Sequence, residues 1–162
     1  MSRPTAYPQA VYDLFACSSK SSQKDFNVTP HEEASCQWER LASEIRRRDA
    51  IDGLLGSPKR YLTENWNGEG AAPIPETAFQ EARAFLGKLP ATIPLPEVIT
   101  EPDGYLGLEW YAHKWLMFVV SFNGKGALSC SGIFGPERSY GTRYMDDGIP
   151  AGILRDIAKV LQ

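Results

Sequence analysis

The chain has 162 residues, of which 43% are hydrophobic and 23% are charged, and its formal net charge is −3. This length suits one domain, and this composition is ordinary for a globular protein. The negative charge argues against a broad nucleic-acid interface, which needs a basic face. The basic run Arg46-Arg47-Arg48 lies in a helical pattern beside Glu44 and Asp49, so we interpret it as a solvated helix face.

Cysteine and histidine are too sparse to predict a disulfide framework or a metal site. Three cysteines stand at wide spacings and there are two histidines. The apolar stretch from Val11 to Cys17 is broken by Asp13, so it does not resemble the core of a signal peptide. No apolar run approaches the length of a membrane span. We therefore expect a cytoplasmic protein without a cofactor, a bound metal or a membrane contact.

Residues 1–28 are predicted to be an amino-terminal arm that can be mobile in part, ahead of a single α+β domain over residues 29–162. Thr29-Pro30 has the chemistry of a helix cap followed by a first helical position. The helix that follows carries an apolar stripe. Gly56 interrupts the helical pattern, and the stripe before it is formed by Ala34, Trp38, Leu41 and Ile45.

The stretch from Asn65 to Pro75 is the turning point of the sequence. It holds two glycines, two asparagines and two prolines within eleven residues, so a regular element cannot cross it. Trp66 is expected to anchor this hinge on the core, with its indole N–H bonded to a carbonyl. The hinge can be a connector, or it can be a ligand or partner site on a rigidly held loop. The candidate binding residues here are Asn65, Trp66, Asn67 and Glu69.

Beyond the hinge, a helix from Pro75 or Glu76 is predicted to stop at Leu89-Pro90. The hydrophobic period then changes to two. Val98 to Glu101 is predicted to be an edge strand, and the nearly apolar run from Trp115 to Phe122 a central strand. Pro150 begins a last helix. The predicted fold is therefore α+β, with amino-terminal helices, an antiparallel meander of four or five strands, and a carboxy-terminal helix, all helices lying on one face of the sheet.

The sheet face without helices is predicted to be half polar and to carry aromatic side chains. Alternation along the strands places Glu109, Ser129 and Ser131 on it, together with Tyr105 and Tyr111. Such a face is suited to docking another macromolecule. Tyr105, Glu109 and Tyr111 therefore complete the set of candidate binding residues.

The hinge also carries a resemblance. Residues 65–71, Asn-Trp-Asn-Gly-Glu-Gly-Ala, are similar to the N-W-D-G-x-G-A signature of small uncharacterised bacterial proteins. Over about residues 60–135 the later features of that family follow in the same order: Ala82, Ala84, Phe85-Leu86, Leu89-Pro90, Pro102-Asp103-Gly104 and Leu108-Glu109-Trp110. The chain departs from the pattern at Asn67, where the family usually has aspartate, and in its longer amino-terminal extension. The resemblance implies a small α+β fold and carries no activity.

Catalytic constellations are weak in this sequence. Cys130 and His113 could form a nucleophile and base, but Cys130 falls in phase with Leu128 as a core residue, and nothing supplies an orienting third group. A small enzyme with a carboxylate and histidine site near Glu69, Glu109 and His113 is the alternative that remains.

No catalytic residue and no metal ligand is therefore predicted. We expect a non-enzymatic module that binds another protein, as an inhibitor or antagonist of a bacterial protein, in the manner of a mobile-element inhibitor or an antitoxin. The oligomeric state stays open.

Overall fold

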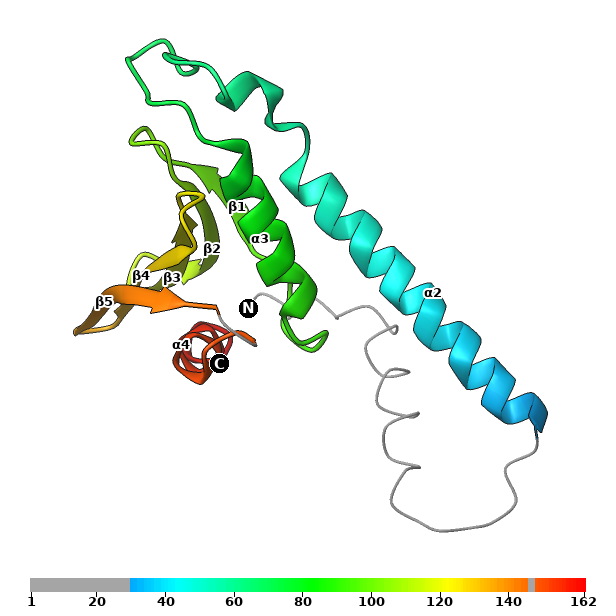
Figure 1. The fold of residues 1–162 in the computed structure, drawn as a ribbon. Helices are drawn as coiled ribbons and strands as arrows, with labels where there is room; N and C mark the ends of the chain where they lie inside the picture. Colours follow the sequence, from blue (N-terminus) through cyan, green and yellow to red (C-terminus); the bar gives the residue numbers. More distant parts are fainter. Residues whose placement is uncertain (1–29, 146–147) are drawn as a thin grey trace, which may run out of the picture. The chain divides into compact units, whose positions relative to one another are not determined.

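The computed structural model describes residues 30–145 and 148–162. They belong to two compact units, the first ending at Arg46 and the second running from Arg47 to Gln162. The predicted arm over residues 1–28 and the Thr29 cap lie outside the described residues. The elements are α2 (Pro30–Leu55), η2 (Pro58–Tyr61), α3 (Glu76–Lys88), β1 (Glu97–Thr100), β2 (Leu106–His113), β3 (Leu116–Phe122), β4 (Ala127–Phe134), β5 (Glu137–Tyr144) and α4 (Ala151–Val160) (Figure 1). This confirms the α+β class.

The five strands form one antiparallel meander. Their order in the sheet is β1-β2-β3-β4-β5, so neighbours in the sequence are neighbours in space. β3 is the central strand and β1 is at an edge, as predicted. Trp115 lies just before β3 and is exposed, and a bulge between Tyr111 and His113 shifts the register of β2 against β3. The meander follows from short turns, because each strand pairs with the next one available.

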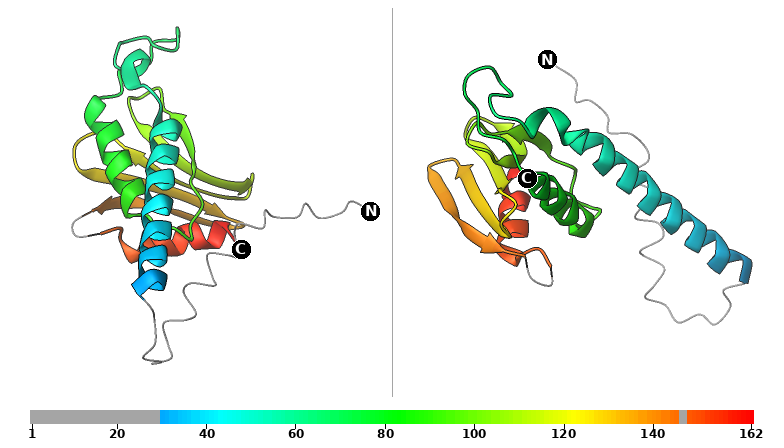
Figure 2. Two further views of the ribbon diagram at one scale, coloured as in Figure 1. Left: turned by 90° about the vertical axis from the view of Figure 1, so that its right-hand side faces the viewer. Right: turned by 45° about the horizontal axis from the view of Figure 1, so that its top comes forward.

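Both α3 and α4 cover the same face of the sheet (Figure 2), which confirms the predicted layers. Alternate residues of the strands point into this layer. α3 contributes Ala78, Phe79, Ala82, Phe85 and Leu86; α4 contributes Ile153, Ile157 and Val160; the strands contribute Leu106, Leu108, Trp110, Phe118, Val120, Phe122, Leu128 and Cys130. Among the residues that the structure describes, this core begins at Ile51.

The stripe of α2 divides into an exposed part and a buried part. Trp38, Leu41 and Ile45 are 70%, 46% and 51% exposed, whereas Ile51 and Leu55 are each 5% exposed and join the core. An apolar stripe at helical spacing normally packs on a core. The last turns of α2, which belong to the second unit, pack on the core of that unit.

Two polar contacts fix the ends of the helical layer. The Glu81 carboxylate on α3 accepts hydrogen bonds from the backbone N–H groups of Gly124 and Gly126, at 2.9 and 2.7 Å. It thereby holds the tip of the β3–β4 hairpin against α3. The indole N–H of Trp110 donates to the Pro94 carbonyl at 3.0 Å, which ties the crossover after α3 to the sheet.

Candidate functional site

The hinge is anchored by Trp66, as the sequence predicts. Its half-buried indole donates a hydrogen bond to the Ala72 carbonyl at 2.9 Å. Its ring meets the ring of Tyr61 edge-on, with 5.2 Å between the centroids. The indole therefore closes the loop on itself and also supports the segment that precedes it.

The two hinge asparagines are used inside the loop. Asn65 has a positive φ of 58°, and its Oδ1 accepts from the N–H of Gly70 at 2.7 Å. Oδ1 of Asn67 accepts from the N–H groups of Glu69 and Ala71, at 2.9 and 3.1 Å. Side-chain acceptors of this kind hold tight turns. The Oδ1 atom of Asn67 therefore holds two backbone N–H groups of the same turn.

The hinge glycines explain why the loop needs this composition. Gly68 and Gly70 have φ values of 81° and 85°, a region that side chains with a Cβ rarely adopt. The side chain of Glu69 between them is exposed. Asn65, Trp66 and Asn67 are thus structural in this geometry, and Glu69 is the hinge residue whose side chain is free to meet solvent.

Glu69, Glu109 and His113 are not brought together. The hinge is bonded to the turn that precedes β2, through the N–H of Ala72 and the carbonyl of Pro102 at 2.8 Å. His113 ends β2 at the opposite end of that strand, and Glu109 lies about 13 Å along the strand from it. The Nδ1 atom of His113 accepts from the N–H of Trp115 at 3.3 Å. These positions give no common point at which the three groups could act.

The opposite face of the sheet, which α3 and α4 do not cover, is called the outer face below. The strand register defines its rows of neighbouring residues. One row crosses all five strands as Glu97, Glu109, Val119, Ser131 and Tyr140. A second row crosses four strands as Tyr111, Met117, Ile133 and Arg138. Apolar side chains therefore occupy the middle of the outer face, with aromatic and charged side chains around them.

The β1 side of the outer face is acidic. Glu97 and Glu109 are direct cross-strand partners. Burial, and then the charge of Glu97, raises the pKa of Glu109 above its ordinary value of 4.5. Like charges opposite each other in a sheet are destabilising. A cation placed between the two carboxylates would relieve that repulsion.

A third carboxylate is placed on this side by the absence of a side chain at Gly107. A Cβ there would come within 2.5 Å of the Ile99 side chain and 2.9 Å of Oε1 of Glu101. That same Oε1 accepts a hydrogen bond from the hydroxyl of Ser121 at 2.6 Å, and Ser121 is buried. Glu101 is thereby held over β2 and extends the acidic side.

The predicted face residues are placed as follows. Tyr111 is 55% exposed, whereas Tyr105 is half-buried, and its hydroxyl accepts from Nδ2 of Asn123 at 3.4 Å. Sequence reasoning missed Tyr140, which is 86% exposed in β5. The alternation of side chains along β5 could have placed Tyr140 on one of the two faces of the sheet. It identifies the outer face only once Ser131 is known to be the cross-strand partner of Tyr140.

Cys130 faces the core and is chemically quiet. Burial is the main reason that its pKa rises to about 11; Arg143 lowers it and Asp156 raises it further. A thiol of this kind is protonated at neutral pH and is a poor nucleophile. His113 is exposed at the end of β2. In residues 30–145 and 148–162 no group of three histidine, cysteine or acidic side chains could hold a metal ion.

Comparison with known proteins found no matching family model, no matching curated protein and no matching solved structure. Across the part of the chain that the structure describes, no helix combines the length and apolar character needed to cross a bilayer.

Proposed function

We propose that this protein is a non-enzymatic module that binds another protein through the outer face of its sheet. The observation that supports this most directly is the composition of the outer face. Met117, Val119 and Ile133 form a half-buried apolar centre, and exposed Tyr111 and Tyr140 flank it. Aromatic residues around an apolar centre are characteristic of the energetically dominant parts of protein interfaces.

The charges indicate what kind of partner fits. Glu97, Glu101 and Glu109 lie on the β1 side, and Arg138 lies on the β5 side. A partner with lysine or arginine opposite the acidic side would be steered to the face and would offset the repulsion between Glu97 and Glu109. We therefore propose a partner that presents an apolar patch with basic side chains on the side that meets Glu97, Glu101 and Glu109.

The role as an inhibitor or antagonist is part of this proposal. A module that covers a functional surface of its partner needs no chemistry of its own. The enzyme alternative gains no support, because Glu69 lies in the hinge, which is bonded to the turn before β2, and His113 lies at the opposite end of β2 from that turn.

The test is quantitative affinity capture from cells of the source organism, followed by direct titration of the captured protein in purified form. The double variant Tyr111→Ala, Tyr140→Ala is expected to weaken binding by about 2 kcal/mol or more, roughly thirtyfold. Trp38→Ala is the matched control, since it removes an aromatic side chain that is 70% exposed on α2. The partner's own activity, measured with a stoichiometric amount of this protein, then tests antagonism.

Two results would count against the proposal. One is a partner whose affinity is unchanged in the double variant and reduced by Trp38→Ala. The other is a purified partner whose binding is insensitive to Glu97→Gln and Glu109→Gln at low salt, because the acidic side would then have no part in recognition.

A further inference from the structure

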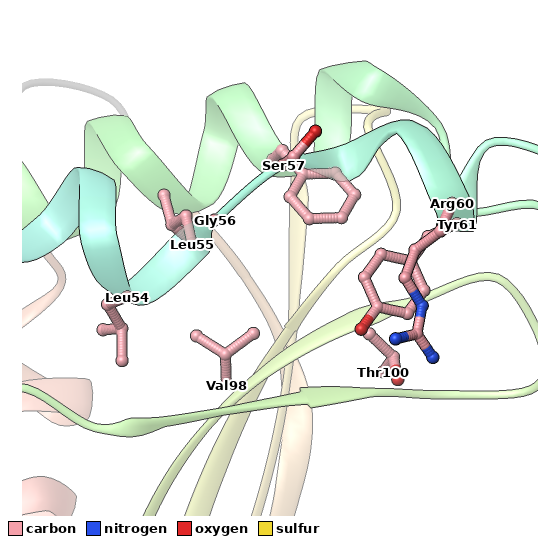
Figure 3. A pocket seen from close by; sticks show the side chains of 9 residues that line it. Leu54, Leu55, Gly56, Ser57, Arg60, Tyr61, Val98 and Thr100 are labelled. Carbon is pink, nitrogen blue, oxygen red and sulfur yellow. The ribbon is translucent and has the colours of Figure 1, made fainter.

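A small pocket opens on the helix side of β1, away from the outer face. Its volume is about 260 Å³, and it lies within the second unit, between the end of α2, η2, α3 and β1 (Figure 3). Pockets for drug-sized ligands run from roughly 300 to 1,000 Å³. This pocket therefore suits a smaller molecule. Its lining includes Leu54, Leu55, Phe79 and Val98 as apolar wall, and Arg60, Tyr61 and Thr100 as polar groups.

The pocket has two ends of different chemistry. Figure 3 shows the guanidinium of Arg60, the hydroxyl of Tyr61 and Thr100 toward one end, and Leu54 and Val98 toward the other. Val98 and Thr100 pair with Leu108 and Leu106, so their side chains share the helix-covered side of the sheet. A ligand that fills both ends must have an apolar part and a polar head.

The charge of Arg60 sets the sign of that head. Its guanidinium lies 4.7 Å from the centroid of the Tyr61 ring. The ion pairs in the described part of the chain are Arg83 with Asp52 and Lys159 with Asp156, and neither involves Arg60. No acidic side chain lines the pocket. A guanidinium that rests on an aromatic ring presents its N–H groups in a fork that matches a carboxylate.

One opposing effect comes from α2, whose carboxyl end also lines the pocket. A helix carboxyl terminus carries about half a negative charge, spread over its last carbonyls. Figure 3 places Leu55 and Gly56 away from the guanidinium of Arg60. The full charge of Arg60 therefore dominates at the polar end, and the weaker negative field falls at the apolar end, where no charge of the ligand would lie.

We propose that this pocket binds a small aliphatic monocarboxylate, with its carboxylate on Arg60 and the hydroxyls of Tyr61 and Thr100, and its tail against Leu54, Leu55, Phe79 and Val98. The inference is independent of the docking role of the outer face. The hinge supports the site indirectly, because Trp66 packs on Tyr61, and Tyr61 in turn stacks on Phe79 with 6.2 Å between the ring centroids.

The experiment is a titration of the isotopically labelled full chain with octanoate, followed by backbone amide NMR. Octanoate is expected to shift the amide signals of residues 54–61 and 98–100 and to leave those of β4 and β5 unchanged. Arg60→Gln is expected to weaken the binding about tenfold, which corresponds to about 1.4 kcal/mol. Neutral octanamide should bind the unaltered protein about tenfold more weakly than octanoate does.

Lys59→Gln is the matched control, because Lys59 is an exposed cation next in sequence that does not line the pocket. It should bind octanoate like the unaltered protein. The proposal is overturned if octanoate shifts no signal of the pocket, if octanamide binds as tightly as octanoate, or if Lys59→Gln and Arg60→Gln weaken binding equally. The comparison of octanoate with octanamide uses the unaltered protein, so it decides the question even if Arg60→Gln fails to fold.

Discussion

At the scale of single residues, Trp66 connects the hinge to η2 and, through Tyr61, to α3. Its indole closes the loop on the Ala72 carbonyl, and its ring supports Tyr61, which stacks on Phe79 of α3. A residue that joins a loop, a 3₁₀ turn and a core helix contributes more to stability than its half-buried surface alone indicates. The hydrogen bond and the ring contacts are separable by substitution.

Trp66→Ala is expected to lower the free energy of unfolding by about 2 kcal/mol, less than for a fully buried tryptophan, because the side chain is only half-buried. Trp66→Phe keeps a ring and loses the indole donor, so about 1 kcal/mol is expected. Urea unfolding followed by circular dichroism measures both. Glu69→Ala, which changes an exposed side chain of the same loop, should be neutral within about 0.5 kcal/mol. Equal stability of the Trp66→Ala protein would remove the anchoring role.

At the scale of elements, α2 has two different parts although it is one continuous helix. Its stripe is exposed at Trp38, Leu41 and Ile45 and buried at Ile51 and Leu55. The buried part belongs to the second unit, where Ile51 and Leu55 join the core. The same helix therefore offers a matched pair of sites with similar chemistry and opposite burial.

Ile51→Ala is expected to destabilise the protein by about 2–4 kcal/mol, because it leaves a cavity in the core. Ile45→Ala removes the same atoms from a side chain that is 51% exposed and should cost less than about 1 kcal/mol. The measurement is the denaturant midpoint at constant slope. Similar losses for the two variants would show that the exposed stripe is covered in solution.

The sequence predicted the elements and layers of this fold because those features are local. The change of hydrophobic period at Glu97 marks the sheet, and the glycines and prolines near residues 65–75 mark the hinge. Alternation also predicted that Glu109 and Tyr111 share a face. The pocket at Arg60 includes Tyr61, whose ring stacks on that of Phe79. These two residues are separated by eighteen positions in the sequence and lie in different elements. No hydrophobic periodicity predicts such a contact. The exposure of Trp38, Leu41 and Ile45 could not be predicted either, because the spacing of apolar residues is the same in a buried stripe and in an exposed one.

At the scale of the whole molecule, the outer face carries opposite charges on its two sides. Carboxylates gather on the β1 side and Arg138 lies on the β5 side. The raised pKa of Glu109 shows that its ionised form is disfavoured in the folded protein. Stability and binding are therefore expected to depend on the same pair of carboxylates in opposite ways, since a basic partner needs them ionised.

The sign of the pH dependence follows from that shift. Because the folded pKa of Glu109 is raised above 4.5, its contribution to stability is fully present below 4.5 and is lost as the pH rises through the folded value. Glutamine carries no charge, so Glu109→Gln removes the unfavourable ionised group. It should therefore raise the melting temperature at neutral pH and leave it unchanged below pH 4.5, where Glu109 is protonated. Glu69→Gln is the control at an exposed carboxylate. Thermal unfolding at several pH values measures the effect, and a stabilisation that persists in acid would refute the electrostatic cause.

The order of the strands has a consequence for how the chain emerges during synthesis. Each strand pairs with the one made just before it, so every hairpin can close as soon as its second strand is available. The core, however, also requires Ile153, Ile157 and Val160 of α4, which are translated after all five strands. A nascent chain stalled before residue 151 would hold a paired sheet with part of its apolar layer open to water, and such a chain is a natural substrate for chaperones and a source of aggregation.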